Sequence, residues 1–308
     1  DLLKRYPKSA FKIEIESLLI DSYISSNNYK EALELLENKS RKVHKESYQK
    51  VTFFRALELY NNAKYSDAKE LLNRSLSTAI DPIFKARATY WKAESDYQLS
   101  NFSEALEGFF DFKNSIKSPQ LDEFKNLEYN IAYTYFKLKQ YALANKSFQS
   151  FIATKPKNLI LLNDAFLRLG DSYFVTTQYS PGIDAYQAAL KLGQIELDYA
   201  TFQIAVSYGY LGQISDKITG LIRVLKFKKS HLKDQALFEL GNTYVNQETP
   251  EKALPFYTQL ITDYPSSVLV SKALLRKGLM LYNRGDTQAA LDNLNKVAVN
   301  YPSTPEAF

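Results

Sequence analysis

The residue types that most often carry out catalysis or bind metal ions are few in this chain and stand far apart. Its 308 residues include two histidines, His44 and His231, and no cysteine. A metal site or a general base needs converging partners, so we expect both histidines to lie in exposed turns. Without cysteine the chain has no disulfide, thiolate metal site or cysteine nucleophile. The adjacent acids Asp122 and Glu123 are typical of the first turn of a helix.

Cofactor-binding patterns are also missing from the sequence. The ten glycines form no phosphate-binding loop, and most of them stand where two helices would pack together. We therefore predict that the chain is not an enzyme and has no catalytic residue, cofactor or metal ion, unless a domain outside this segment supplies the chemistry.

Charge and hydropathy exclude two further classes of function. The chain has 39 basic and 34 acidic residues, and the basic ones are spread along it, which argues against a nucleic-acid partner. No apolar run approaches eighteen residues, so no membrane insertion is predicted. The unusual feature is the aromatic content, with 23 Tyr and 19 Phe against one Trp.

A short phrase recurs along the whole chain: a polar residue, usually an aromatic one, two variable residues, and then a small residue. Examples are "NYKEAL", "NFSEAL" and "DTQAAL", and successive copies are 35 to 39 residues apart. Such a period is typical of repeat architectures. The small position is occupied in turn by Ala32, Ala68, Ala105, Ala144, Gly182, Lys217, Ala253 and Ala290.

In each unit another small residue stands twelve positions earlier, at the first small position, so Ala32 and its equivalents occupy the second small position. The first small position is occupied in turn by Ile20, Ala56, Ala93, Ala132, Gly170, Ala205, Gly241 and Gly278. Small residues let two helix backbones approach closely, and apolar positions at helical spacing surround them, as in "ALFELGNTYV". Each unit is therefore predicted to be a pair of antiparallel helices, and no segment alternates as a strand would. Lys217 and Ile20 depart from the pattern, so their units should pack less regularly.

The small–large–small pattern resembles the tetratricopeptide repeat, most closely in "ALFELGNTYVNQETPEKALPFYTQLITDYP". The resemblance implies an all-α fold without strands, a right-handed α-solenoid of about eight antiparallel helix pairs. We expect one solenoid over residues 1–308, taken from a longer array. Its approximate units are 10–44, 45–80, 81–118, 119–157, 158–194, 195–230, 231–266 and 267–303.

Three copies of the phrase "YPxS" mark junctions between units, at "RYPKS", "DYPSS" and "NYPST". Proline ends the second helix of a pair, and the following Ser or Thr can cap the next helix. This phrasing resembles bacterial envelope proteins of the same repeat class, such as the lipoprotein of the β-barrel assembly machinery and the Tol–Pal coordinator. It implies a periplasmic or outer-membrane-tethered location, with a cytoplasmic location as the alternative.

The resemblance also indicates where a partner would bind, because the first helices of such pairs line a concave face. The candidate residues stand three before, one after or four after the first small residue. They form an aromatic series that suits a peptide or protein partner: Phe53, Tyr60, Tyr90, Tyr97, Tyr129, Tyr133, Phe136, Phe174, Phe202, Phe238 and Tyr282. Ordinary packing between repeats is the alternative for any single member.

The predicted function is a non-catalytic scaffold that binds a peptide or partner protein in this groove, in bacterial envelope assembly or transport. The alternative is a cytoplasmic regulatory or sensor array joined to an output domain outside this segment. Glycan binding is a third class, but Trp91 is the only Trp that could stack on a sugar. Recognition of a terminal carboxylate is disfavoured, because the position three before the small residue carries no Lys or Arg.

Overall fold

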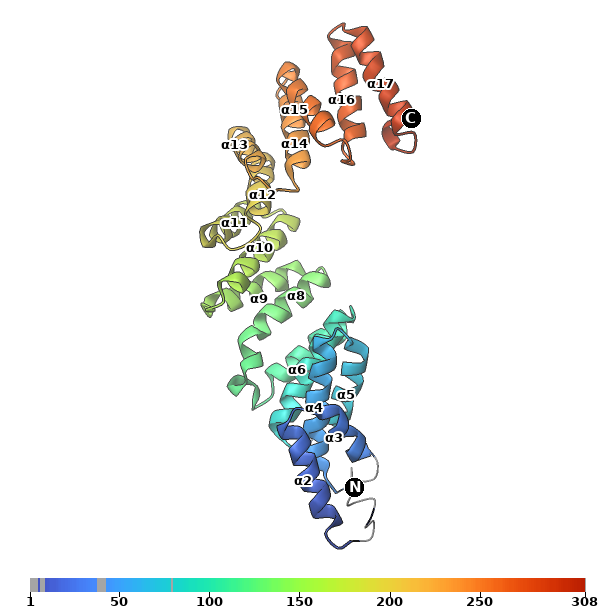
Figure 1. The fold of residues 1–308 in the computed structure, drawn as a ribbon. Coiled ribbons are helices and arrows are strands. Elements are labelled where there is room, and N and C mark those ends of the chain that lie inside the picture. Colours follow the sequence, from blue (N-terminus) through green and yellow to red (C-terminus); the bar gives the residue numbers. More distant parts are fainter. Residues whose placement is uncertain (1–4, 6–8, 38–42, 79, 308) are drawn as a thin grey trace. The chain divides into compact units, whose positions relative to one another are not determined.

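The computed structural model describes residues 5, 9–37, 43–78 and 80–307. These residues form sixteen α-helices and a few short 3-10 helices, and no strand occurs within the described ranges. The predicted all-α fold of paired helices is confirmed (Figure 1). The structure divides into two compact units, residues 1–155 and residues 156–308. The expectation of one continuous array across both units stays a prediction.

The first unit contains four helix pairs, each joined by a short turn (Figure 1). The Asp81 carboxylate caps α6 by accepting from the Ile83 amide at 2.7 Å, and Pro82 follows as the first helical residue. In chain order the helices are α2 (Lys12–Ser25), α3 (Tyr29–Leu35), α4 (Lys45–Asn61), α5 (Tyr65–Ser77), α6 (Pro82–Gln98), α7 (Phe102–Lys113), α8 (Leu127–Lys137) and α9 (Tyr141–Ala153).

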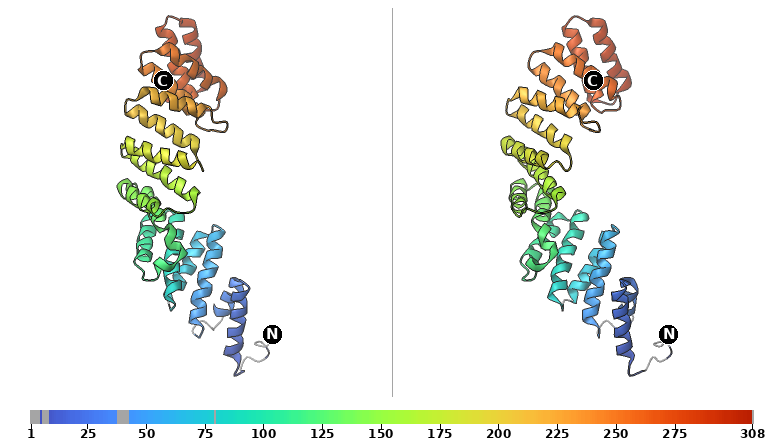
Figure 2. Two further views of the ribbon diagram at one scale, coloured as in Figure 1. Left: turned by 90° about the vertical axis from the view of Figure 1, so that its left-hand side faces the viewer. Right: turned by 60° about the vertical axis from the view of Figure 1, so that its left-hand side comes forward.

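The second unit repeats the arrangement with four further pairs, which stack side by side in both views of Figure 2. The Asn158 side chain caps its first helix by accepting from the Ile160 and Leu161 amides. The helices are α10 (Leu159–Val175), α11 (Tyr179–Leu192), α12 (Leu197–Tyr210), α13 (Ile214–Leu225), α14 (Lys233–Asn246), α15 (Pro250–Asp263), α16 (Val270–Asn283) and α17 (Thr287–Asn300).

All eight turns within the pairs share one backbone conformation. In each turn, the residue five before the second small position has a positive φ, and only Gly212 and Gly285 of the eight are glycine. The following N–H donates to the carbonyl five residues back, as from Lys64 to Leu59 at 2.9 Å. This is the Schellman ending of a helix, so the backbone rather than glycine content defines the turn. In the other six of these turns the positive-φ residue is Asn27, Ala63, Ser100, Lys139, Thr177 or Glu248.

The core of each unit consists of clusters that join consecutive pairs. One cluster in the first unit combines Ala93 of α6, Phe109 and Phe112 of α7 and Ile131 of α8, all nearly inaccessible to solvent. In the second unit a corresponding cluster runs from α14 to α17. Because consecutive pairs within a unit bury apolar surface against each other, a pair depends on its neighbours in that unit for stability.

The small residues are needed because large side chains lie directly against them. A Cβ atom added at Gly241 would lie 2.5 Å from the Tyr257 ring, and one added at Gly170 would lie 2.6 Å from the Tyr186 ring. Both tyrosines are fully buried and stand four residues after the second small position. The equivalent position elsewhere is also large and apolar: Leu36, Leu72, Phe109, Phe148, Leu221 and Leu294.

The two residues that depart from the small pattern are accommodated differently. Ile20 is fully buried in the core of the first pair. The Lys217 stem lies over Gly209, where an added Cβ would be 2.7 Å from Lys217 Cδ. Its ammonium group reaches Glu239 on α14 at 2.8 Å. Lys217 therefore links α13 to the next pair instead of loosening its own.

The "YPxS" phrase ends one helix and shapes the turn that follows. Helix α15 ends at Asp263, directly before Tyr264 and Pro265. The Ser267 hydroxyl accepts from the Leu269 amide at 3.2 Å, three residues before α16 begins. The serine thus stabilises the turn rather than acting as the helix N-cap. Ser9 accepts from Phe11 in the same way, whereas Pro7 lies outside the described residues.

Candidate partner-binding site

Two members of the predicted aromatic series belong to the core. Phe53 is 0% exposed and packs with Ala56 and Leu72, and Tyr90 is 5% exposed and packs with Phe109. Their inclusion among the partner contacts is corrected accordingly. Both side chains are buried because the residue three before the first small position also faces the second helix of its own pair.

Four other members pack across the turn of their own pair. Each of these four stands four residues after the first small position and packs on the aromatic residue that begins the second helix. The ring centroids are 5.2 to 5.5 Å apart, and the ring planes are inclined by 64 to 78°. This edge-to-face geometry is favourable and helps to fix the angle between the helices. The pairs are Tyr60–Tyr65, Tyr97–Phe102, Phe136–Tyr141 and Phe174–Tyr179.

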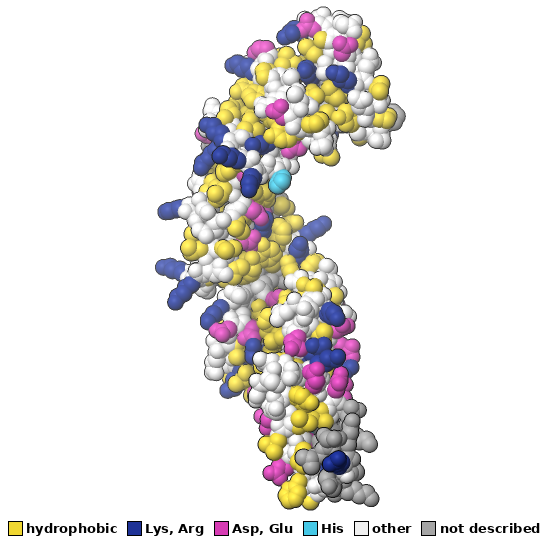
Figure 3. Space-filling view, in the orientation of Figure 1, with side chains coloured by type: hydrophobic (Ala, Val, Ile, Leu, Met, Phe, Trp, Pro, Cys, Tyr) yellow, Lys and Arg dark blue, Asp and Glu magenta, His cyan; other side chains and the backbone are white. Residues whose placement is uncertain are grey.

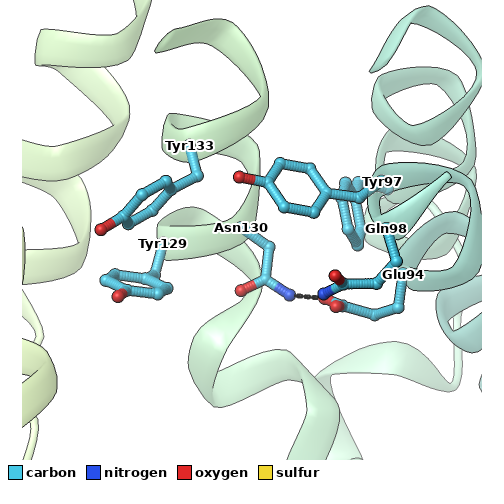
Figure 4. Close-up of a pocket in the computed structure, with 7 residues that line it drawn as sticks. Glu94, Tyr97, Gln98, Tyr129, Asn130 and Tyr133 are labelled. Atoms are coloured by element: carbon cyan, nitrogen blue, oxygen red, sulfur yellow. Dashed lines mark hydrogen bonds between the residues drawn. The ribbon is translucent and has the colours of Figure 1, made fainter. Parts of the chain in front are cut away.

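A pocket of about 240 Å³ opens in the first unit between α6 and α8 (Figure 4). Three members of the aromatic series, Tyr97, Tyr129 and Tyr133, line it. Figure 4 shows the Tyr97 ring extending from α6 toward Tyr133 on α8. The pocket thus brings together residues from three helices, and its remaining lining consists of Glu94, Gln98, Phe109 and Asn130.

Glu94 is held in this pocket by neutral donors. The Asn130 amide donates to one carboxylate oxygen, as Figure 4 shows, and the Tyr60 hydroxyl donates to the other at 3.2 Å. The Tyr90 hydroxyl also bonds the carboxylate and accepts from Asn130 at 2.8 Å. Gln98 in turn lies 3.5 Å from the Tyr60 hydroxyl. The network joins α4, α6 and α8 at the base of the pocket.

Burial changes the acid–base chemistry of this group. Desolvation raises the pKa of Glu94 to about 7, against the lowering effect of the hydrogen bonds from Tyr90 and Tyr60. Desolvation and the nearby Glu94 charge likewise raise the pKa values of the Tyr60 and Tyr90 hydroxyls well above their ordinary value. Both tyrosines therefore remain neutral donors over the whole physiological range.

In the second unit the predicted series is divided between separate places. Phe202 and Phe238 line a pocket of about 300 Å³, together with Asp234, Gln235, Glu239, Val268 and Leu269. Phe174 instead contacts Tyr179 and Tyr210, whose rings stack in parallel at 4.7 Å. Tyr282 has no aromatic neighbour across its turn and is 62% exposed. These predicted residues of the second unit therefore lie in separate surroundings and do not line one pocket.

Glu94, Gln98 and Asn130 were missed as site residues by sequence reasoning. Glu94 directly follows Ala93 and so occupies one of the candidate positions. The predicted series contains only aromatic residues, and Glu94 is therefore not a member. Asn130 stands two residues before Ala132, outside the candidate positions. The signal that could have found them is a carboxylate four residues after Tyr90 on one helix face.

The described residues contain no group of His, Asp and Glu side chains able to hold a metal ion. His231 is exposed as expected, but His44 is largely buried, with Nε2 3.9 Å from Glu16. No helix among the described ranges is long and apolar enough to cross a membrane. On the face shown in Figure 3, Lys and Arg side chains occur along most of the chain, and several of them gather at the left edge of the view.

The family model of the tetratricopeptide repeat matches residues 127–158, 235–267 and 272–304. These segments coincide with the pairs α8–α9, α14–α15 and α16–α17, so these three pairs are tetratricopeptide repeats. No curated protein sequence matches the chain.

Solved structures with the same fold are numerous, and three of them illustrate the likeness. The C-terminal part of a repeat-containing protein from Cytophaga hutchinsonii has a TM-score of 0.66 at 16% identity, covering 83% of this chain and 97% of that one. The apo form of RapI has a TM-score of 0.64 at 14% identity, covering 93% and 86%. YrrB, described as having an unusual peptide-binding site, has a TM-score of 0.51 at 19% identity, covering 67% and 98%. At these identities the likeness concerns the fold.

Proposed function

We propose that this protein is a non-catalytic scaffold that binds an extended segment of a peptide or partner protein. The observation that carries the proposal is the pocket between α6 and α8, where three tyrosine rings and a partly buried carboxylate meet on neighbouring helix pairs. Tyrosine suits recognition because its ring contributes a large contact area and its hydroxyl a hydrogen bond. Tetratricopeptide repeats generally bind peptides or proteins, which supports the proposal, as does the peptide-binding site described for YrrB.

Selection from a library of random linear peptides displayed on phage, with the 308-residue chain as target, tests this function. We expect enriched peptides whose binding weakens in the double variant Tyr97→Leu/Tyr133→Leu. The variant Tyr282→Leu is the matched control, because Tyr282 is an exposed tyrosine in the other unit. Failure to enrich any peptide would count against the scaffold, and equal loss in both variants would count against the pocket.

For the cellular context we propose an assembly or transport role in the bacterial envelope, periplasmic or tethered to the outer membrane. The support is the "YPxS" phrasing at the ends of helix pairs, as at Tyr264 and Tyr301. Fractionation of the source cells followed by immunodetection tests the location. Recovery in the cytoplasmic fraction would favour the regulatory or sensor array instead.

A further inference from the structure

The buried acidic groups of this protein are paired with a cation, whereas the partly buried and desolvated Glu94 is not. Asp96 lies 2.5 Å from the Lys69 ammonium group, and Asp171 lies 2.6 Å from the Arg168 guanidinium. None of the ion pairs among the described residues includes Glu94. Desolvating a carboxylate without a neighbouring cation is costly, and such an arrangement points to a partner that supplies the charge.

The carboxylate keeps one acceptor position available. A carboxylate offers about four lone-pair sites. Three neutral groups, the Tyr60 hydroxyl, the Tyr90 hydroxyl and the Asn130 amide, occupy three of them. These donors hold the Glu94 oxygens in place on the side where the pocket opens. The site is therefore organised before any ligand arrives.

The rest of the pocket is suited to a cation. Tyr129 and Tyr133 have ring centroids 4.9 Å apart with planes inclined by 59°, and the Tyr97 ring extends toward them from α6 (Figure 4). Aromatic rings attract a cation placed over their faces, most strongly where water is excluded. A carboxylate beside several such rings is the chemistry that recognises an ammonium or guanidinium group.

The described residues that line the pocket or contact Glu94 include no cationic side chain. They come from α4, α6, α7 and α8. They are Tyr60, Tyr90, Tyr97, Gln98, Phe109, Tyr129, Asn130 and Tyr133.

We propose that this pocket takes the ammonium or guanidinium group of a lysine or arginine side chain from the partner segment. The inference rests on the proposed function and names the ligand class of the same site. The pocket volume of about 240 Å³ suits one extended side chain, since sites for drug-sized molecules hold about 300–1,000 Å³. The pocket then recognises one position of the partner, while the neighbouring helix surfaces contact the rest.

The protonation of Glu94 gives the site a pH dependence. Without a cation, burial raises the pKa of this group to about 7. A bound cation favours the ionised form and lowers that pKa, so binding releases a proton at slightly acidic pH. Affinity for the cation accordingly increases as the pH rises toward and through 7.

Carbon-13 NMR of the glutamate-labelled chain tests the site directly. The Glu94 carboxyl resonance is assigned from its loss in Glu94→Gln. The probes are N-acetyl-lysine methylamide, its arginine analogue, and N-acetyl-norleucine methylamide as the uncharged isostere. We expect the two cations to move the Glu94 resonance and lower its titration midpoint, and norleucine to leave it unchanged. The Tyr133→Leu variant should weaken the lysine probe, whereas Tyr141→Leu, outside the pocket, should not.

Peptides obtained by phage selection supply the second measurement. Their binding should weaken about tenfold or more in Glu94→Gln, as expected for loss of a hydrogen bond to a charged group. The exposed acid Glu104 provides the control Glu104→Gln, which should bind normally. If neither cation shifts the Glu94 resonance, the inference is overturned. The scaffold function is still supported in that case if peptides are enriched. A responsive Glu94 without enriched peptides supports the cation site and counts against the scaffold.

Discussion

At the scale of single residues, Glu94 makes the stability of the protein depend on pH. Desolvation raises the pKa of its carboxyl group from the ordinary glutamate value of 4.5 to about 7 in the folded chain. Between these values the folded state binds more protons than the unfolded state, so the free energy of unfolding falls as the pH rises. The loss amounts to at most about 3.5 kcal/mol, at about 1.4 kcal/mol per pKa unit, and is smaller because Glu94 is partly exposed to solvent.

Urea unfolding of wild type and Glu94→Gln between pH 4.5 and 8 measures this effect. We expect wild type to lose stability relative to the variant as the pH rises to about 7, and to stay level above it. Glutamine keeps one oxygen acceptor, for the Asn130 amide, and its NH2 group can donate to the Tyr60 hydroxyl, so most of the network is preserved. Parallel pH profiles for the two proteins would show that the carboxylate is not desolvated.

Two glycines in the second unit make a matched comparison of packing. An alanine at Gly241 would place Cβ 2.5 Å from the Tyr257 ring, which is buried and hydrogen-bonded to Asn242 at 2.8 Å. We expect Gly241→Ala to destabilise the protein by about 1–3 kcal/mol, because the ring must move. Thermal unfolding measures the change.

The control is Gly182→Ala in α11. An added Cβ there meets its nearest neighbour, the Gly170 carbonyl oxygen, at 3.5 Å, which is ordinary contact. Alanine is the better helix former by about 1 kcal/mol, so this variant should be more stable than wild type. The same sign of change for both variants would contradict the packing account.

At the scale of elements, six of the eight turns within the pairs place a residue other than glycine at a positive φ, which strains the backbone. Thr177 is exposed, is β-branched and has a φ of 59°. Glycine would relieve strain of about 1–2 kcal/mol and lose about 0.4–1 kcal/mol through greater freedom of the unfolded chain. We therefore expect Thr177→Gly to raise the free energy of unfolding by roughly 0.5–1 kcal/mol.

The neighbouring Thr176 provides the control for this turn. Its hydroxyl donates to the Ser172 carbonyl at 2.8 Å, and its φ is −91°. Thr176→Gly should therefore destabilise the protein in the same urea titration. A loss of stability in Thr177→Gly as well would show that the left-handed turn is not strained.

The aromatic residues illustrate how an element decides the role of a side chain. Tyr97 and Tyr282 both stand four residues after the first small position of their pairs. Tyr97 packs on Phe102 and lines the pocket, whereas Tyr282 is exposed and has no ring partner across its turn. The difference lies in the residue that begins the next helix, Phe102 in one case and Thr287 in the other. Burial of one position therefore depends on a residue across the turn.

At the scale of the whole molecule, the chain contains two compact units, residues 1–155 and 156–308. Each has four helix pairs and its own apolar clusters, so each buries enough surface against its own neighbours to fold alone. We expect the separately expressed segments to show helical circular dichroism and a cooperative urea transition. An unfolded segment would mean that the core of one unit depends on the other.

The sequence by itself determined the helix pairs, their period and the close packing of small residues, because these follow from local spacing along one chain. It also excluded cysteine chemistry. The location of the pocket was decided only by the tertiary structure. Tyr60, Glu94 and Asn130 stand about one repeat apart in sequence and meet because consecutive pairs stack. Whether an aromatic side chain is buried, as Phe53 is, or lines a pocket, as Tyr133 does, depends on neighbouring helices that no local pattern records.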